Sequence, residues 1–409
     1  MRGIFPIFFT VFLDLLGLGI IIPILPAVIM DPFGGILPLT CPYSIRIILY
    51  GFLIAAYPIA QFFGAPVLGT LADGYGRKRL LLLSLFGSLC GYCIFVTGII
   101  EKSVSLLFLG RIVDGFTGGN ISIAQAAIAD ISSEKTKARN FGLVGMAFGL
   151  GFVIGPYVGG KLSDPELVPW FNYATPFFLS IILIAINITL AAVNFPETII
   201  KKRKSKISFF TGFVNIRRAF GFRELRIMFL VVFLLNLGHN FFTKFLQVFL
   251  MTKFNYSQSK IGDFYGYMGL WIAVSQGVIL RPRSRRFSPS LILSVSTVMA
   301  AFALPLILVP KNPAWLYVVI PFVSILQGMN QPNTSAIISN QAGEEKQGEI
   351  LGINQSMQSL SQAIPPIIGG LVTSLSLNLP TILSAALTIS AWAVFVMFYL
   401  QKNKRPVKY

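Results

Sequence analysis

The sequence contains little charge, and acidic residues are especially rare. Only 12% of its 409 residues are Asp, Glu, Lys or Arg, and 15 of these are acidic. A soluble domain carries charge on about a quarter of its residues. Hydrophobic residues make up 55% of the chain, and its mean hydropathy is +0.74. This composition excludes an ordinary soluble globular protein.

Cysteine and histidine are also scarce, with three cysteines and one histidine in the chain. Cys90 and Cys93 lie in an apolar stretch without a further thiol or histidine, and Cys41 stands apart. A metal site of the zinc type needs several N or S ligands close together. We therefore expect no metal and no cofactor. The chain also lacks a nucleophile–base pair and a phosphate-cradling loop, so an enzyme is not expected.

Long apolar runs are abundant. Each is long enough to cross a bilayer as a helix, and we count twelve, at about 4–30, 45–72, 80–100, 105–131, 140–162, 173–195, 226–251, 258–280, 289–309, 314–339, 349–376 and 380–401. Backbone polar groups in lipid must be satisfied within the segment. We therefore predict an all-α integral membrane protein with twelve transmembrane helices. The first run is too long for a signal-peptide core and lacks a small-x-small cleavage pattern, so we expect it to be retained.

The basic residues are distributed unevenly between the two sides of these runs. Of 33 Lys and Arg, 25 fall in one alternating set of segments, six in the other set and two within spans. This asymmetry follows the positive-inside rule and predicts that both termini are cytoplasmic. The net charge of +18 thus indicates topology and anionic lipid headgroups rather than a nucleic acid partner. We expect a monomeric multi-pass protein of a bacterial inner membrane.

The two halves of the chain are related by an internal repeat. An offset of 210 residues places 118–160 on 328–370, and Pro156-x-x-Gly159-Gly160 falls on Pro366-x-x-Gly369-Gly370. Many secondary transporters consist of duplicated six-helix halves around a midplane site. We predict two pseudo-symmetric six-helix bundles, over 1–195 and 226–409, joined by a cytoplasmic basic central loop over 196–225.

The central loop contains a short amphipathic segment. Five apolar residues recur at helical spacing, with Arg217 and Arg218 on the other side: Phe209, Phe210, Phe213, Ile216 and Phe220. This pattern favours an interfacial helix on the inner leaflet. A calmodulin-binding helix would have a similar pattern.

The stretch GTLADGYGRKRLLLLS, residues 69–84, interrupts the apolar sequence between the second and third runs. It can be a simple cytoplasmic turn, or Arg77 can bridge Asp73 to Asp130 at the end of the fourth run. In the repeat, Arg283 replaces Asp73 and Asn340 replaces Asp130, while the bases are kept. Bases alone suffice to orient a helix, so the joint absence of both acids favours a bridge. We interpret the group as a cytoplasmic gate made of Gly69, Asp73, Gly76, Arg77 and Asp130.

Three ionisable residues lie inside predicted spans. Asp14 is midway along the first run, and Arg111 and Asp114 share a face of the fourth. Such residues are costly in a membrane and are functional candidates. We predict that at least one of the two carboxyls carries a coupled proton. Alternatively, the carboxyls merely satisfy Arg111 or a hydrogen bond between helices.

The fifth run is rich in glycine. Gly151, Gly155 and Gly159 form a stripe of small residues that allows close helix packing, and Pro156, followed by Gly160 four residues later, marks a bend. A close, smooth contact of this kind is also where two helices can slide.

Amide and aromatic side chains accumulate in several spans, mainly in the second half. We predict that they line a cavity for a neutral or zwitterionic, partly aromatic organic molecule. A single histidine in a span is more often a hydrogen-bonding residue than a proton relay. The predicted cavity residues are Tyr57, Gln61, Asn120, Asn236, His239, Asn240, Gln327, Asn330, Gln331 and Gln358.

Four of these motifs resemble those of a known family. The pattern G-x-L-x-D-x-x-G-R-K from residue 69 resembles the signature loop of the major facilitator superfamily, and GRIVDGFTGGN resembles its motif in the fourth helix. The glycines and proline of the fifth run resemble the motif associated with antiporters. LDLLGLGIIIPILP in the first run is similar to the corresponding helix of tetracycline:proton and related drug antiporters.

The resemblance implies the major facilitator fold and proton-coupled antiport of a small organic compound or drug by alternating access. No cofactor is implied, because the proton gradient drives such transport. An importer of a nutrient, metabolite or siderophore would use the same fold and buried acids. A non-transporting receptor or scaffold on a transporter fold is a further alternative.

Overall fold

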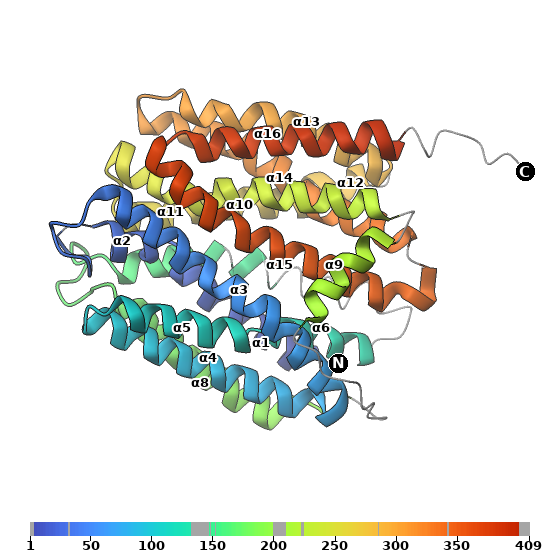
Figure 1. The fold of residues 1–409 in the computed structure, drawn as a ribbon, viewed down its shortest axis with the longest axis horizontal. Helices are drawn as coiled ribbons and strands as arrows, with labels where there is room; N and C mark the ends of the chain where they lie inside the picture. Colours follow the sequence, from blue (N-terminus) through green and yellow to red (C-terminus); the bar gives the residue numbers. More distant parts are fainter. Residues whose placement is uncertain are drawn as a thin grey trace, which may run out of the picture. The chain divides into compact units, whose positions relative to one another are not determined.

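The structure is a computed structural model of the chain. It describes residues 4–31, 33–131, 147, 149–151, 153–198, 210–221, 225–284, 286–341 and 343–400. Every regular element in these ranges is a helix (Figure 1). Within them, eight helices are long and apolar enough to span a bilayer. The predicted all-α membrane architecture is therefore confirmed for this part of the chain.

The chain forms two compact units. The first comprises Met1–Thr211 and Asn255–Tyr267, and the second comprises Gly212–Phe254 and Met268–Tyr409. Helix α11 (Gln258–Val274) therefore contributes its first half to one unit and its remainder to the other.

The predicted central loop, 196–225, contains helix α9 (Thr211–Gly221). Its residues 199–209 and 222–224, including the predicted start of the amphipathic segment at Phe209, lie outside the described residues. The boundaries 1–195 and 226–409 stay predictions.

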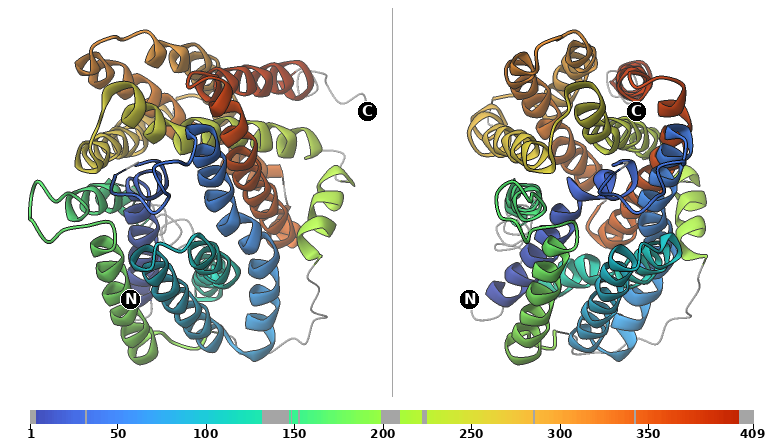
Figure 2. Two further views of the ribbon diagram at one scale, coloured as in Figure 1. Left: turned by 60° about the vertical axis from the view of Figure 1, so that its left-hand side comes forward. Right: turned by 90° about the vertical axis from the view of Figure 1, so that its left-hand side faces the viewer.

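The helices of the first unit include most of the predicted first six spans. They are α1 (Ile4–Ile21), α2 (Ile24–Met30), α3 (Tyr43–Tyr75), α4 (Arg77–Ile100), α5 (Val104–Thr117), α6 (Asn120–Ile131) and α8 (Thr175–Asn194), with residues 153–162 helical between α6 and α8. Helix α5 packs against both α3 and α4, and α8 packs against α1 and α4 (Figure 1 and Figure 2).

Two predicted spans are each divided in the structure. The run 4–30 is interrupted at Ile22–Pro23, between α1 and α2. Proline lacks the N–H that would continue the helical hydrogen bonds. The run 105–131 is interrupted at Gly118 and Gly119, between α5 and α6, where two successive poor helix formers weaken the helix. Residues Ile7–Met30 nevertheless count as one candidate span, whereas the run 105–131 forms two separate helices, α5 and α6.

The core of the first unit is formed by aliphatic residues from helices that are distant in sequence. Ile7 and Val11 of α1 pack with Leu81 and Leu85 of α4 and with Ala124 of α6, and all five are at most 1% exposed. Between membrane helices, such contacts stabilise the bundle through van der Waals packing. This packing fixes α1 against α6, the two helices that carry Asp14 and Asp130.

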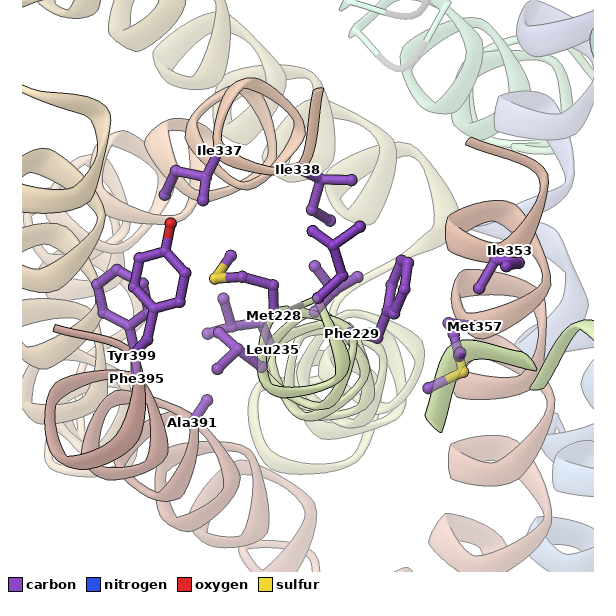
Figure 3. Packing of buried hydrophobic residues seen from close by; sticks show 14 of the residues in the cluster. Met228, Phe229, Leu235, Ile337, Ile338, Ile353, Met357, Ala391, Phe395 and Tyr399 are labelled. Atoms are coloured by element: carbon purple, nitrogen blue, oxygen red, sulfur yellow. The ribbon is translucent and has the colours of Figure 1, made fainter. Parts of the chain in front are cut away.

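The second unit is built around α10. Its elements are α9, α10 (Arg226–Phe254), the π-helical segment η1 (Ser275–Leu280), α12 (Arg281–Arg283), α13 (Pro289–Ala303), the 3-10 segments η2 (Leu304–Leu308) and η3 (Pro313–Trp315), α14 (Leu316–Gln341), α15 (Gly343–Leu375), α16 (Leu379–Val394) and the π-helical η4 (Phe395–Leu400). Residues of α10 pack with residues of α14, α15, α16 and η4 in one apolar cluster. Figure 3 shows Phe229 on the side of α10 that faces Ile353 and Met357 of α15.

A buried arginine organises the loop that follows α2. Arg46 was counted from the sequence as one of the few bases on the outer side, yet its side chain is only 3% exposed. Its guanidinium donates hydrogen bonds of 2.6–3.4 Å to the backbone carbonyls of Ile29, Asp31, Leu37, Pro38 and Cys41. These charge-assisted bonds replace hydration of the buried cation.

Asp31 links the same loop to the segment before α8. Its carboxylate accepts hydrogen bonds from the Phe33 N–H, at 2.9 Å, and from the Tyr173 hydroxyl, at 2.6 Å. Burial, followed by the bond to this carboxylate, raises the pKa of Tyr173 well above its ordinary value. Tyr173 therefore stays a protonated donor.

Candidate functional site

The first unit contains a buried ionic pair with poor geometry. Arg111 and Asp114, one turn apart on α5, are 8% and 5% exposed. Arg111 Nη1 lies 3.7 Å from Asp114 Oδ2, which is too far for a direct hydrogen bond. The guanidinium carbon lies 4.7 Å from the centre of the Tyr57 ring. Arg111 is therefore a buried cation that is stabilised by one loose ion pair and one aromatic face.

The guanidinium also has unused donors. The Nε and Nη1 atoms of Arg111 are buried and lack a hydrogen-bond partner among the described residues. A narrow cleft with room for about one water molecule lies beside them, lined by Asp114, Tyr92 and Phe177 among others. A single water there can bridge Arg111 and Asp114, whereas an organic substrate would not fit.

Glycines allow the neighbouring helices to approach this pair. A Cβ atom at Gly91 of α4 would lie 2.7 Å from the Asp114 Cβ, and one at Gly115 of α5 would lie 2.3 Å from the Tyr57 carbonyl oxygen. Side chains at these positions would separate α4 and α3 from α5. The glycines at these two positions therefore allow α3 and α4 to pack closely around Arg111 and Asp114.

Asp14 of α1 has a different partner. Its Oδ1 accepts a hydrogen bond from Asn120 Nδ2 at the start of α6, while its Oδ2 is buried without a partner among the described residues. Asn120, predicted to line the substrate cavity, is 2% exposed and contacts this acid instead. No ion pair within the described residues joins Asp14 to Arg111. One carboxylate oxygen thus stays available for a proton.

The loop between α3 and α4 has both contacts expected of a bridge. Arg77 Nη2 lies 2.7 Å from Asp73 Oδ1, and Arg77 Nε lies 3.3 Å from Asp130 Oδ2. Gly76 adopts a φ of +112°, a conformation that L-residues rarely adopt. Gly69 has no such constraint, because a Cβ atom there would meet nothing within 4 Å. The structure therefore gives a local steric reason for Gly76 but none for Gly69.

Glu197 is a member of this group that the sequence reading missed. Its carboxylate accepts hydrogen bonds from the backbone N–H of Arg77, at 2.9 Å, and of Lys78, at 3.3 Å. It thereby caps the positive N-terminus of α4. The neighbouring Thr198 donates its hydroxyl to Asp130 Oδ2 at 2.9 Å. The sequence offered one indication of this role, because Glu197 directly follows the sixth predicted span, on the same predicted side of the membrane as the loop 69–84.

The five predicted residues of the fifth span divide between two helix faces. Cβ atoms built at Gly155 and Gly159 would lie 2.7 Å from the Gly19 Cα and 2.3 Å from the Ile20 carbonyl oxygen. Gly151 likewise lies against α1, with its built Cβ atom 2.7 Å from the Leu15 Cβ. This face is therefore fixed to α1.

Gly160 belongs to the opposite contact, and Pro156 takes part in both, because a Cβ atom built at Gly19 of α1 would lie 3.0 Å from the Pro156 Cδ. A Cβ atom at Gly160 would lie 2.5 Å from the Gln258 carbonyl oxygen and 3.0 Å from the Gly262 Cα, and one at Gly262 would lie 2.5 Å from the Pro156 carbonyl oxygen. Both Gln258 and Gly262 belong to the first half of α11. The predicted motif thus joins α1 on one side and α11 on the other.

The remaining predicted cavity residues form separate local groups. In the second unit, His239 Nδ1 lies 2.9 Å from Gln327 Oε1, which joins α10 to α14. Asn330 Oδ1 accepts a hydrogen bond from Ser296 at 2.9 Å and is therefore held against α13. In the first unit, Gln61 Nε2 donates to the Gly118 carbonyl at 2.7 Å.

The other four residues that were predicted to line the cavity make no such contact in the described part of the chain, or only local ones. Asn236 and Asn240 donate their amide groups to backbone carbonyls four residues earlier, each at 2.8 Å. Gln331 is exposed and Gln358 is half-buried. Their assignment to a substrate cavity stays a prediction.

Comparison with known proteins decides the family. Residues 7–366 match the family model described as Major Facilitator Superfamily. This chain belongs to the Major Facilitator Superfamily. The predicted family, fold and non-enzymatic class are therefore confirmed, and this member of the superfamily is a multi-pass membrane transporter.

Relatives of this transporter include drug-resistance proteins. It is 30% identical over 362 residues to the tetracycline resistance protein, class C, of Escherichia coli, covering 88% of this chain and 86% of the relative. It is 26% identical over 410 residues to the quinolone resistance protein NorA of Staphylococcus aureus, covering 99% and 97% of the two chains.

A solved structure has the same fold. The human organic anion transporter MFSD10 matches with a TM-score of 0.73 at 21% identity, covering 96% of this chain and 98% of that one. At this identity the similarity shows the fold alone.

Proposed function

We propose that this transporter exports a small organic compound in exchange for protons, by alternating access. The observation that carries the proposal is a set of buried polar atoms, Asp14 Oδ2 and Arg111 Nε and Nη1, that have no hydrogen-bond partner in the described part of the chain. Unpaired polar atoms in a membrane span are costly, and such groups usually serve ion or proton movement. A purely structural group would have its hydrogen bonds completed.

In this mechanism Asp14 and Asp114 are the proton acceptors. The guanidinium of Arg111 lies 3.7 Å from the Asp114 carboxyl and stabilises it after the proton has left. Asn120 orients Asp14 and leaves its second oxygen open. Arg77, with Asp73 and Asp130, latches the cytoplasmic side in one of the two states, and a charge-assisted bridge of this kind contributes about 1–3 kcal/mol.

Export is favoured over import by the relatives and by the fifth span. The relatives are named for resistance to tetracycline and to quinolones, which is consistent with a drug or a similar partly aromatic compound as substrate. We also propose a monomer in the bacterial inner membrane, with both termini cytoplasmic, as the distribution of Lys and Arg predicts.

Proteoliposomes that contain a pH-sensitive dye test the coupling. An imposed proton gradient is applied, and proton flux is followed after addition of tetracycline, a quinolone and a panel of other aromatic compounds. We expect at least one compound to move against its gradient while protons move down theirs. We expect Asp14→Asn and Asp114→Asn each to reduce the coupled flux at least about tenfold, because each removes a proton carrier. Glu101→Gln, an exposed outer acid, is the matched control.

The outcomes separate the alternatives. If both Asn variants keep coupled transport of an identified substrate, proton coupling through these acids is wrong. If substrate and protons move in the same direction, the protein is a symporting importer instead. If a compound is transported and none changes proton flux, the proposal of proton-coupled transport is rejected.

A further inference from the structure

Helix α9 presents two chemically different faces. The face toward the second unit contains Ala219, which is 1% exposed and lies in the apolar cluster around α10, and Ile216, which packs against the same cluster. Asn215 Nδ2 donates to Ser356 Oγ of α15 at 3.1 Å. Figure 1 shows α9 beside α15, where this bond joins them. One face of α9 is therefore fixed to the unit.

The other face is exposed and combines apolar with cationic side chains, so the expectation that the arginines lie opposite Phe213 was wrong. Phe213 and Val214 are 50% and 42% exposed. Arg217 and Arg218 follow four residues later and are also exposed. Residues four apart lie one above the other on a helix, so each apolar side chain is aligned with one guanidinium. Phe213 and Val214 lie nearer the N-terminal end of this face, and Arg217 and Arg218 lie nearer its C-terminal end.

The position of α9 in the chain places this face near a membrane surface. Helix α10, which is apolar enough to span a bilayer, begins at Arg226, only a few residues after α9 ends at Gly221. With 11 residues, α9 is too short to cross the membrane itself. It therefore lies at the level where a spanning helix leaves the hydrocarbon.

In the sequence, the stretch 198–223 that contains α9 has charge of one sign and lies between Glu197 and Glu224. No acidic residue occurs between Thr198 and Arg223, and the bases of this stretch are Lys201, Lys202, Arg203, Lys204, Lys206, Arg217, Arg218 and Arg223. An electropositive surface with aromatic side chains at the membrane boundary is complementary to anionic headgroups above acyl chains. A guanidinium binds a phosphate with two parallel hydrogen bonds.

We propose that the exposed face of α9 is a binding site for an anionic phospholipid of the adjacent leaflet. Arg217 and Arg218 bind the headgroup phosphate, and Phe213 and Val214 contact the upper acyl chain. Asn215, Ile216 and Ala219 hold the helix on the second unit, so a bound lipid is attached to α15 and to the start of α10. The site is separate from the buried carboxyls, and its test does not depend on proton-coupled export.

Native mass spectrometry of the full chain in detergent tests the site. Dioleoylphosphatidylglycerol and dioleoylphosphatidylcholine are titrated separately, and the fraction of lipid-bound protein is measured. We expect the anionic lipid to bind about thirtyfold more tightly, as two bases at a membrane surface provide. We expect Arg217→Gln with Arg218→Gln to abolish this preference. The control removes two exposed bases elsewhere, Lys260→Gln with Lys311→Gln, and keeps the preference.

A second variant separates a lipid from a free phosphate. Phe213→Ser with Val214→Ser is expected to weaken both lipids about equally, and excess inorganic phosphate is expected not to displace phosphatidylglycerol. Unchanged thermal unfolding of each variant shows that α9 remains folded on the unit. A preference that survives loss of both arginines, or no preference in the wild type, overturns the proposal. Displacement by phosphate, with no effect of the serine variant, would make it an anion site and overturn it as a lipid site.

Discussion

The ammonium of Lys161 lies 2.9 Å from the Asp263 carboxylate and 2.8 Å from the Ser259 hydroxyl. Lys161 belongs to the helical residues 153–162, and its two partners belong to the first half of α11. Beside this polar contact, Gly160 and Gly262 meet without side chains. All these residues belong to the first compact unit, so the contact holds the first half of α11 within that unit.

The Lys161–Asp263 ion pair is expected to contribute modestly to stability. The two side chains are 31% and 38% exposed, so solvent screens the interaction, and we expect a coupling energy of about 0.2–1 kcal/mol. A double-mutant cycle with Lys161→Gln and Asp263→Asn, followed by thermal unfolding in detergent, measures it. The coupling should shrink in high salt. In the control cycle, Lys260→Gln on α11 replaces Lys161→Gln and is again combined with Asp263→Asn. A coupling energy equal to that of Lys161 would contradict a specific pair.

The contact between Gly160 and Gly262 is expected to be intolerant of side chains. In Gly262→Leu, the new side chain meets the Pro156 carbonyl oxygen, to which even a Cβ atom would approach within 2.5 Å, so the helices must separate. Ser259, now 6% exposed, should become accessible when replaced by cysteine in a chain without other thiols. The rate of alkylation by a membrane-impermeant maleimide measures this. Gly277→Leu, where a Cβ atom meets nothing within 4 Å, should leave the rate unchanged.

The sequence predicted best the contacts that depend on local spacing. Arg111 and Asp114 are three residues apart on α5, so helical geometry alone brings this pair together. Asp73 and Arg77 are four apart in sequence, but they belong to α3 and α4, and the turn at Gly76 brings them together. The apolar runs predicted the spans for a similar reason, because length and hydropathy are local properties.

Contacts between distant segments were not predictable in the same way. Asn120 meets Asp14 across 106 residues, and Lys161 meets Asp263 across 102. Which residues meet depends on how α1, α6 and α11 pack, and the hydrophobic periodicity of a single helix does not predict its neighbours. Arg46 shows a related limit, since its position near a span end predicted an outer charge but not its burial among carbonyls.

The glycine face toward α1 is expected to control stability. In Gly155→Ala, the added Cβ atom would lie 2.7 Å from the Gly19 Cα, and overpacking of this kind costs about 1–3 kcal/mol. Unfolding in detergent should show a lower midpoint. Gly69→Ala, which meets nothing within 4 Å, is the control and should be neutral or slightly stabilising in its helix. Equal effects of both substitutions would mean that packing against α1 is not the cause.

Glu197 is expected to stabilise the start of α4. In Glu197→Ala, the N–H groups of Arg77 and Lys78 lose their carboxylate acceptor, and loss of such a cap costs about 0.5–2 kcal/mol. Glu197→Gln keeps an acceptor oxygen and should lose less. Thermal unfolding in detergent measures both, with Glu101→Gln as the control for removing an exposed acid. A Gln variant as unstable as the Ala variant would show that the charge, rather than the hydrogen bond, is what matters.

The bridge from Arg77 to two acids is expected to set how readily the cytoplasmic side opens. Arg77→Ala removes both ion pairs, whose bias of about 1–3 kcal/mol corresponds to at least about a fivefold change in the equilibrium between states. Arg77→Lys should be intermediate, because a single ammonium lacks the planar fork that reaches two carboxylates.

Thiol accessibility on the cytoplasmic side measures this equilibrium. Ala72, which is fully buried beside the bridge, is replaced by cysteine in a chain without other thiols, and its alkylation rate is followed. The rate should rise in Arg77→Ala and in Asp73→Asn, together with a change in transport rate. Arg79→Ala, which removes an exposed base of the same loop, is the control. If Arg77→Ala alters neither alkylation nor transport relative to that control, the loop is a topological turn and the ion pairs are not a gate.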